Sequence, residues 1–415
     1  MNARISAGEW RSGWRSVALT ALGLTCAPAT LPVYTLGILV ASLTAEFQWN
    51  RAEIQAAILF STGLGLAGGP LAGWLVRRFG LRTTIVSGLI GMGASLLLCA
   101  GMSGSLWQLY GAYGMMSLLG AGANAVAWST YVAASFDKSR GLALGIALSG
   151  TGLSAVLMPR IASAGLDQWG WRAAYLALAA FVLVVVLPLC TLSVPRDVPR
   201  QAASGNPTGA ASGMDVREVV RTPKFWLIGL SSACIYMAVG GLIPNLVPAL
   251  TDRGMTSSDA VSVMGVMGFT IVAGRIAVGV LVDRIWAPLV ALIVLVPAAT
   301  GCVLLNTDQP FFVYSISAAA IGLVTGMEFD MLAFLIGRYF GLRDYARIYG
   351  RLYMFLAVAA GTAPMAFGAM YDRTGTYTIP VAAAATLLLI GAATMLLLGR
   401  YPDLDSHSKY QPTAA

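Results

Sequence analysis

A basic loop between two apolar segments constrains this chain more than any other feature, because the sequence contains it twice. The first copy is Gly73-Trp-Leu-Val-Arg-Arg-Phe-Gly-Leu-Arg82, and a shorter copy, Gly279-Val-Leu-Val-Asp-Arg284, follows 206 residues later. Each copy lies between two long apolar segments, one copy in each half of the chain. The repeat therefore predicts a protein made of two related halves.

The composition places both halves in a membrane. Of the 415 residues, 57% are hydrophobic and only 11% are charged, too few charges for the surface of a soluble protein of this length. A spanning helix takes about 20 apolar residues. We predict an all-α membrane protein with twelve spans in two pseudo-symmetric six-helix bundles, at 16–45, 52–76, 83–103, 106–135, 140–164, 172–194, 225–250, 257–282, 287–306, 310–337, 347–370 and 377–399.

A Gly/Ser/Pro/Ala-rich segment separates the sixth span from the seventh and reads as a linker. The predicted units are an N-terminal bundle (1–194), a cytoplasmic linker (195–221), a C-terminal bundle (222–400) and a cytoplasmic tail (401–415). Further repeat matches relate Asn50, Glu53, Gly145, Pro159, Asp167 and Gly170 to Thr256, Asp259, Gly350, Pro364, Asp372 and Gly375. Six spans separate the copies, so both halves cross the membrane in the same direction, as in transporters with parallel repeats.

The Lys/Arg distribution predicts the orientation. With both termini in the cytoplasm, twenty basic residues lie on the cytoplasmic side and four outside. This bias accounts for the net charge of +8 without nucleic acid. The single histidine, His407, and five unpaired apolar-segment cysteines predict neither a metal site nor a disulfide framework, and we expect no cofactor. The chain also lacks the constellations that a membrane enzyme or a nucleotide-driven pump needs.

Three ionisable residues lie inside predicted spans, where a charge is costly and marks a functional candidate. Arg275 lies about 12 Å and Glu328 about 15 Å from the cytoplasmic end of its helix, at 1.5 Å per residue. Asp330 follows on another helical face. The repeat aligns Arg275 with Gly69 and Glu328 with Asn124, so only the C-terminal half carries these charges.

Arg275 is the candidate ligand for a substrate carboxylate, because its guanidinium is a planar, bidentate donor. Glu328 and Asp330 are candidates for proton coupling, and Glu328 also for the resting counter-ion of Arg275. The alternative is a fixed salt bridge between Arg275 and either acid. Polar partners that could complete a substrate site are Tyr34, Asn124, Trp128, Tyr131, Tyr236, Asn245 and Tyr353.

The loop resembles the signature of the major facilitator superfamily, Gly-x-Leu-x-Asp-Arg-x-Gly-x-Arg. The first copy departs from it at Arg77, where the family usually has Asp, and the second copy keeps that Asp as Asp283. In the family this loop helps to hold one conformation. The resemblance therefore implies gating roles for Gly73, Arg77, Arg78, Gly80, Arg82, Asp283 and Arg284.

A narrower resemblance is to the oxalate/formate antiporter and monocarboxylate porter branch. It rests on Val33-Tyr-Thr-Leu-Gly37, Glu46-Phe-Gln-Trp-Asn-Arg51, Arg140-Gly-Leu-Ala-Leu-Gly145, Gly170-Trp-Arg172, Gly274-Arg275, Arg338-Tyr-Phe-Gly341 and Tyr371-Asp-Arg-Thr-Gly375. Where animal monocarboxylate carriers place an Asp four residues before the eighth-helix Arg, this chain has Ile271, so their proton relay does not transfer directly.

The branch implies alternating-access transport of a small organic anion, a monocarboxylate or short dicarboxylate, by proton symport or anion exchange. The expected setting is a monomer in a lipid bilayer, the bacterial inner membrane. The alternative is an efflux pump or an importer of a larger metabolite such as a drug, aromatic acid or siderophore.

Overall fold

The computed structural model describes residues 2–63, 65–136, 139–195, 213–282, 284–341 and 343–402. Over these ranges the chain is helical, and the only β pairing is an isolated bridge between Gly213 and Gly341. The predicted linker (mostly 196–212), Asp283 and most of the predicted tail (403–415) lie outside the described residues.

The N-terminal half folds into twelve short and long helices that correspond to the first six predicted spans. They are α1 (Asn2–Leu24), α2 (Leu31–Phe47), α3 (Arg51–Gln55), α4 (Ala57–Gly63), α5 (Gly65–Phe79), α6 (Leu81–Ala100), α7 (Leu106–Leu119), α8 (Ala125–Ser135), α9 (Arg140–Leu148), α10 (Gly150–Trp169), α11 (Trp171–Ala180) and α12 (Leu187–Ser193). A 3₁₀ turn, η1 (Gly120–Ala123), joins α7 to α8, and a π-helical turn, η2 (Phe181–Val186), joins α11 to α12.

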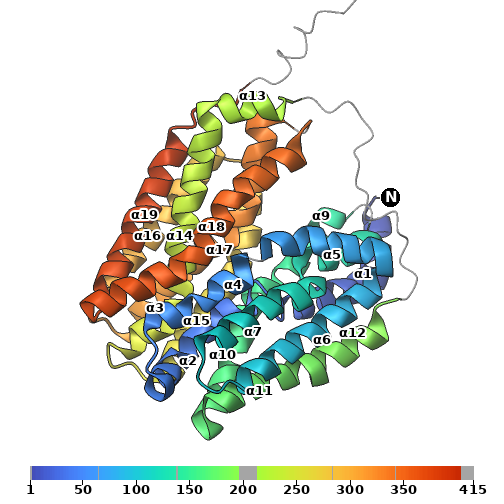
Figure 1. Cartoon of the computed structure of the whole chain (residues 1–415). Helices are drawn as coiled ribbons and strands as arrows, with labels where there is room; N and C mark the ends of the chain where they lie inside the picture. Colours follow the sequence, from blue (N-terminus) through green and yellow to red (C-terminus); the bar gives the residue numbers. More distant parts are fainter. Residues whose placement is uncertain are drawn as a thin grey trace, which may run out of the picture.

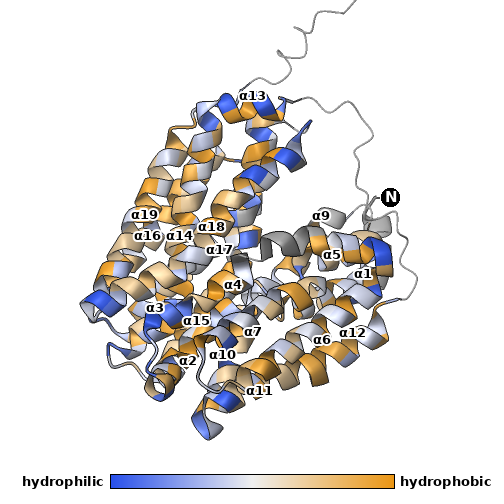
Figure 2. Ribbon diagram, viewed as in Figure 1, coloured by the Kyte–Doolittle hydropathy of each residue, from blue (hydrophilic) through white to orange (hydrophobic). Residues whose placement is uncertain are grey.

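The C-terminal half is built from longer, continuous helices. They are α13 (Val216–Arg221), α14 (Pro223–Thr251), α15 (Ser257–Val282), α16 (Ala287–Leu305), α17 (Phe311–Phe340), α18 (Tyr345–Thr374) and α19 (Thr378–Leu396). After the short α13, these helices are the seventh to twelfth spans. Figure 2 shows hydrophobic residues along the outer flanks of these helices, as expected for surfaces in contact with lipid.

Nine segments of the described chain are long and apolar enough to cross a membrane as single helical stretches. The other three predicted spans, 16–45, 52–76 and 106–135, are each assembled from shorter helices. The first breaks at Thr25–Thr30, around Pro28. The fourth breaks at η1, where a side chain on Gly122 would meet the backbone oxygen of Thr84 at 1.9 Å. The close approach of α6 therefore requires glycine at this position.

The repeat predicted from the sequence is visible in the structure. Pro159 lies inside α10 and Pro364 inside α18, its counterpart. Gly170 and Gly375 end these two helices with φ of +84° and +70°, a conformation that favours glycine. Asn50 forms a capping box with Glu53 at the start of α3, and Thr256 and Asp259 are hydrogen-bonded at the start of α15.

Within the described residues, the two bundles meet mainly through four helix pairings: α10 with α15, α2 with α14, and α18 with both α3 and α4. A side chain on Gly37 of α2 would lie 1.9 Å from the backbone oxygen of Pro244 in α14, so these two helices touch through their backbones. Figure 1 shows the bundles joined around α2, α3, α10 and α15 and diverging toward the end that carries α13 and the N-terminus. The molecule is therefore closed at one end of the bundle interface and splayed at the other.

Candidate functional site

Arg275 and Asp330 form an ion pair between α15 and α17, with 3.7 Å between Arg275 Nε and Asp330 Oδ2. The Arg275 side chain is only 6% exposed, whereas that of Asp330 is 39% exposed. Gly326 makes the pair possible, because a side chain there would collide with the backbone of Ile271 and Arg275. Of the two partners that the sequence left open for Arg275, the structure places Asp330 within ion-pair distance.

Glu328 lies next to this pair and is buried, with 7% of its surface exposed. Its Oε1 has no hydrogen-bond partner among the described residues. The charged and polar groups that act on its carboxylate are Tyr236 and Arg275. Glu328 and Tyr236 line a cavity of about 10 Å³ between α14 and α17, the lower limit of the space that one water molecule needs.

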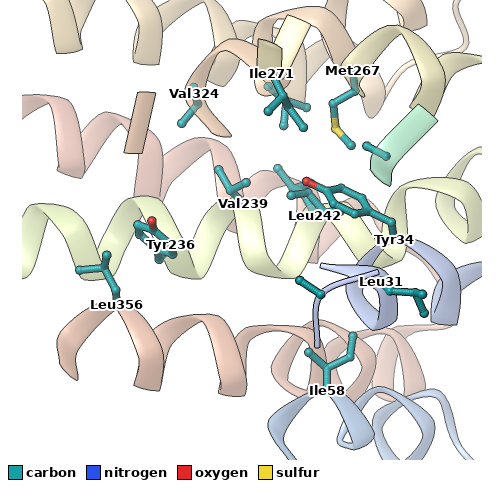
Figure 3. Close-up of a cluster of buried hydrophobic side chains, with 14 of the residues drawn as sticks. Leu31, Tyr34, Ile58, Tyr236, Val239, Leu242, Met267, Ile271, Val324 and Leu356 are labelled. Carbon is teal, nitrogen blue, oxygen red and sulfur yellow. The ribbon is translucent and has the colours of Figure 1, made fainter. Parts of the chain in front are cut away.

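Tyrosines from both halves surround these charges. Tyr34 of α2 is 5% exposed and lies within electrostatic range of Glu328 and Arg275. Figure 3 shows Tyr34 and Tyr236 at either end of a row of apolar side chains that includes Val239 and Leu242 of α14. Tyr34 therefore belongs to the N-terminal half but lies near the charged residues Arg275 and Glu328 of the C-terminal half.

A stack of three tyrosines runs along α18 beside the same site. Tyr345, Tyr349 and Tyr353 follow each other with ring centroids 6.0 and 6.2 Å apart. All three are partly buried, and Tyr349 lies within electrostatic range of Arg275 and Asp330. Tyr353, predicted as a site residue, thus belongs to an aromatic wall; Tyr345 and Tyr349 were missed, although their spacing of four residues places them on the same helical face.

Three predicted site residues remain inside the N-terminal bundle. Asn124 caps α8, with its Oδ1 accepting from the Ala125 amide at 2.6 Å. Trp128 is fully buried against α1, where Gly23 leaves room for its ring, and its Nε1 donates to the Ala123 oxygen. Tyr131 donates to the Ser193 oxygen at 3.5 Å. The structure does not bring these three side chains to Arg275, and their contacts are those of bundle packing.

The repeated loop forms the end of α5 and the start of α6. Arg77 and Arg78 are exposed, and Gly80 has a φ of +87° at the turn into α6. Arg82 donates to the backbone oxygen of Thr191 in α12, within the same bundle. Among the described residues, no hydrogen bond or ion pair of this loop reaches the C-terminal half. The gating roles of all seven residues named for the two loop copies stay a prediction.

A polar contact between the two halves lies at the closed end and was not predicted. Arg51, the first residue of α3, forms a bidentate ion pair with Asp252 at the end of α14, at 3.0 and 3.2 Å. Its guanidinium stacks on Tyr371, 3.7 Å from the ring centroid. The Arg51 and Ala52 amides donate to the two oxygens of Asp372 at 3.1 and 2.9 Å.

The same contact extends into the core through Tyr377 and Asn245. Arg51 Nη1 donates to the Tyr377 hydroxyl at 2.9 Å, and that hydroxyl donates to Asn245 Oδ1 at 3.0 Å. Burial raises the pKa of Tyr377, so the hydroxyl keeps the proton that it donates. Gln55 Nε2 also donates to Asn245 Oδ1, at 3.3 Å. Asn245, predicted as a substrate ligand, therefore lies in this contact and not beside Arg275.

We call this set the outer network: Arg51, Ala52, Gln55, Asn245, Asp252, Tyr371, Asp372 and Tyr377. Its members are up to 326 residues apart in the sequence, so no local pattern connects them. One signal was present all the same. The repeat offset that aligns Arg275 with a glycine aligns Arg51 with Ser257, another charge that the other half lacks.

Comparison with known proteins decides the family. The model of the Major Facilitator Superfamily matches residues 16–350. The chain belongs to this superfamily. It is therefore a multi-pass membrane transporter and not an enzyme.

The chain is similar to Monocarboxylate transporter 13 of Bos taurus, with 26% identity over 88% of this chain and 85% of that protein. It is 26% identical to Monocarboxylate transporter 11 of Mus musculus over 88% of this chain and 83% of that protein. The MFS-type transporter YhjX of Escherichia coli K12 is 24% identical over 78% of this chain and 80% of that protein.

Among solved structures, a bacterial homologue of the human lysosomal transporter Spinster, in an inward-facing and occupied conformation, matches with a TM-score of 0.67. The match covers 96% of this chain and 99% of that one, at 19% identity. At this identity the match supports the shared fold alone.

Proposed function

We propose that this protein is a secondary active transporter of a small organic anion, a monocarboxylate or short dicarboxylate. The observation that carries the proposal is Arg275, a nearly buried guanidinium inside a span, within electrostatic range of Glu328 and of Tyr34 from the opposite bundle. A substrate carboxylate would accept two hydrogen bonds from this planar donor. The similarity to monocarboxylate transporters supports the same substrate class.

Asp330 acts as the resting counter-ion in this proposal. Its side chain is more than a third exposed, so water already solvates the acid and leaving Arg275 costs it little. An incoming carboxylate replaces Asp330 at the guanidinium, and Tyr34 brings a hydroxyl from the opposite bundle. A carboxylate bound to Arg275 and Tyr34 would therefore contact both halves of the protein.

Glu328 is the proposed coupling group. A buried carboxylate with one oxygen lacking a partner is costly as an anion, and a proton removes that cost. In proton symport the proton on Glu328 accompanies the anion; in exchange a second anion leaves instead. We expect Glu328→Gln to abolish accumulation driven by a pH gradient while exchange of anion for anion continues.

Alternating access would open and close the two ends of the bundle interface in turn. The structure is closed where the outer network lies, and by the Lys/Arg distribution that end faces outward, with both termini in the cytoplasm. We propose the bacterial inner membrane as the location and a monomer as the working unit, since each chain contains both halves.

The tyrosine stack on α18 favours one class of monocarboxylate substrate, the aromatic acids. Planar rings that follow each other at about 6 Å offer faces on which a benzoate-type ring could pack. Uptake of lactate-, oxalate- and benzoate-type anions by the same preparation distinguishes these sizes. Preference for benzoate, lost in Tyr349→Leu, would favour the aromatic substrate.

The test of the proposed function is uptake into proteoliposomes, with and without a pH gradient. Arg275→Gln should lower anion uptake by about a hundredfold, since a charge-assisted bidentate contact contributes roughly 3 kcal/mol. Arg275→Lys, which keeps the charge without the fork, should retain a measurable fraction. Unimpaired anion uptake by Arg275→Gln would contradict the proposal.

A further inference from the structure

A second basic site lies at the far end of the C-terminal bundle, where α15, α17 and α19 finish. A pocket of about 610 Å³ opens there, lined by Arg284, Arg338 and Arg400 together with Trp286 and Tyr401. None of the described residues that line it carries a carboxylate. In the described part of the chain none of the three arginines forms an ion pair.

The pocket walls are held in place by specific contacts. The Tyr401 hydroxyl accepts a hydrogen bond from the Ala287 amide at 2.9 Å, which fixes the residues after α19 to the start of α16. The Tyr339 hydroxyl donates to the Gly399 oxygen at 2.6 Å. The Arg338 guanidinium lies over the Tyr401 ring, 5.1 Å from its centroid. The segments that carry the arginines are therefore held by hydrogen bonds and ring contacts to neighbouring helices.

The chemistry of the pocket fits a phosphate group. Three guanidinium groups that form no ion pair with any described residue attract a multivalent oxyanion, and each matches the geometry of phosphate oxygens. Basic pockets between helix ends on the cytoplasmic side bind lipid headgroups, and Trp286 is a residue type enriched at headgroup depth. Asp283, next to Arg284 in sequence, lies outside the described residues and could offset at most one of the three charges.

We propose that this pocket binds a phosphate group, supplied by the headgroup of an anionic phospholipid. Val282, the last residue of α15 and part of the pocket lining, follows Arg275 by seven residues, about 11 Å along the helix. The site is therefore separate from the proposed substrate site and does not depend on the proposed function. A lipid seated there would contact the ends of α15, α17 and α19 together and stabilise the C-terminal bundle.

The experiment is native mass spectrometry of the purified full-length protein with added phosphatidylglycerol or phosphatidylcholine. The test variant is Arg338→Gln/Arg400→Gln, and Arg284→Gln is a second, single-site variant in case the double variant folds poorly. The matched control is Arg217→Gln/Arg221→Gln on α13, which removes two exposed arginines from the same bundle beside Asp215 and Glu218. Thermal shift with inorganic phosphate forms a separate arm.

We expect the wild type and the α13 control to retain phosphatidylglycerol over phosphatidylcholine, and the pocket variants to lose at least tenfold in retention. A thermal shift with millimolar phosphate alone, lost in the same variants, would keep the phosphate site and identify a soluble source. Equal lipid retention in the pocket variants and the control would overturn the proposal.

The chain's own tail, which carries Asp403 and Asp405 after Tyr401, is the competing occupant. If the tail filled the pocket, a chain ending at Pro402 would bind phosphatidylglycerol that the full-length chain does not. That result would also overturn lipid occupancy in the full chain.

Discussion

Two corners of the bundle interface are equivalent in the repeat but differ in the structure. At one corner, α3 of the N-terminal half meets the end of α18, and Asp372 accepts hydrogen bonds from the Arg51 and Ala52 amides. At the other, α15 starts at Ser257 near the end of α10, and Asp167 accepts only from Ser163 of its own helix among the described residues. A pocket of about 420 Å³ includes Asp167 and Ser257 at this corner and extends to Arg51 and Asp252.

The position of one arginine explains the difference. In the closed corner Arg51 reaches across to Asp252, whose counterpart at the same offset of 206 is Glu46. Glu46 pairs with Arg172 of its own bundle at 2.9 Å. Arg172 in turn occupies the position of Tyr377, at the offset of 205. The ion pair at one corner, Arg51 with Asp252, therefore joins the two halves. The ion pair at the other, Arg172 with Glu46, lies within the N-terminal half.

This comparison shows how a duplicated sequence can produce one polar closure and not two. The backbone elements at the two corners are the same, a capped helix start and a helix that ends in Asp-x-x-Gly. The side chains at 51 and 257 and at 172 and 377 differ between the corners, and with them whether the ion pair crosses the interface. The outer network should therefore set the equilibrium between the two conformations, with Arg51 contributing most.

The largest expected effect comes from Arg51→Gln. The substitution removes a bidentate ion pair, a hydrogen bond to Tyr377 and stacking on Tyr371, which together contribute about 2 kcal/mol after allowance for their partial exposure. The population open at this end should rise roughly thirtyfold. Spin labels at Ser103 and Thr307 lie in the loops before α7 and α17. Double electron–electron resonance should show a longer distance between the two labels.

Arg172→Gln is the matched control for Arg51→Gln. It breaks the Glu46 pair, which lies within one half, so the distance distribution should stay that of the wild type. An equal shift in both variants would mean that charge alone, and not the crossing contact, controls the interface.

Asp372→Asn should have the next largest effect. The amide keeps one acceptor oxygen but loses the charge and the second acceptor for the α3 amides, at a cost of about 1.4 kcal/mol, or tenfold in the same equilibrium. Asp167→Asn, the equivalent change at the open corner, should leave the distances unchanged. The comparison fails if Asp167→Asn opens this end as far as Asp372→Asn does.

Ser257→Arg should have the smallest effect and the opposite sign. It places a guanidinium near Asp167 at the open corner, where a partly exposed pair contributes up to about 1 kcal/mol. We expect a few-fold lower population open at this end and a correspondingly slower uptake. Ser257→Gln, similar in reach but uncharged, is the control and should behave as the wild type.

Much of this architecture follows from the sequence, because the repeat and the apolar segments are regular. The two halves, the twelve spans and the pairing of Pro159 with Pro364 could be predicted in this way. The breaks in the N-terminal helices could not, since they depend on close approach between helices, as at Gly122. Local periodicity contains no information about such contacts.

The candidate site was predicted in part for the same reason. Arg275, Glu328 and Asp330 were found because charge inside an apolar segment is rare. Which acid pairs with Arg275 depends on the rotation of α17 against α15, and the sequence left it open. Trp128 and Asn245 looked like site residues because polarity in a span is conspicuous, but their partners lie in bundle packing and in the outer network.

The central claim is that Arg275 binds a carboxylate between the two halves. A direct measurement is the thermal stability of the purified protein with a panel of lactate-, oxalate- and benzoate-type anions and their neutral amides, at two pH values. A ligand at 100 times its Kd stabilises the native state by about 2.7 kcal/mol. We expect at least one carboxylate, and not its amide, to raise Tm in the wild type and in Asp330→Asn but not in Arg275→Gln. Equal stabilisation of Arg275→Gln by that carboxylate, or of the wild type by the amide, would contradict the account.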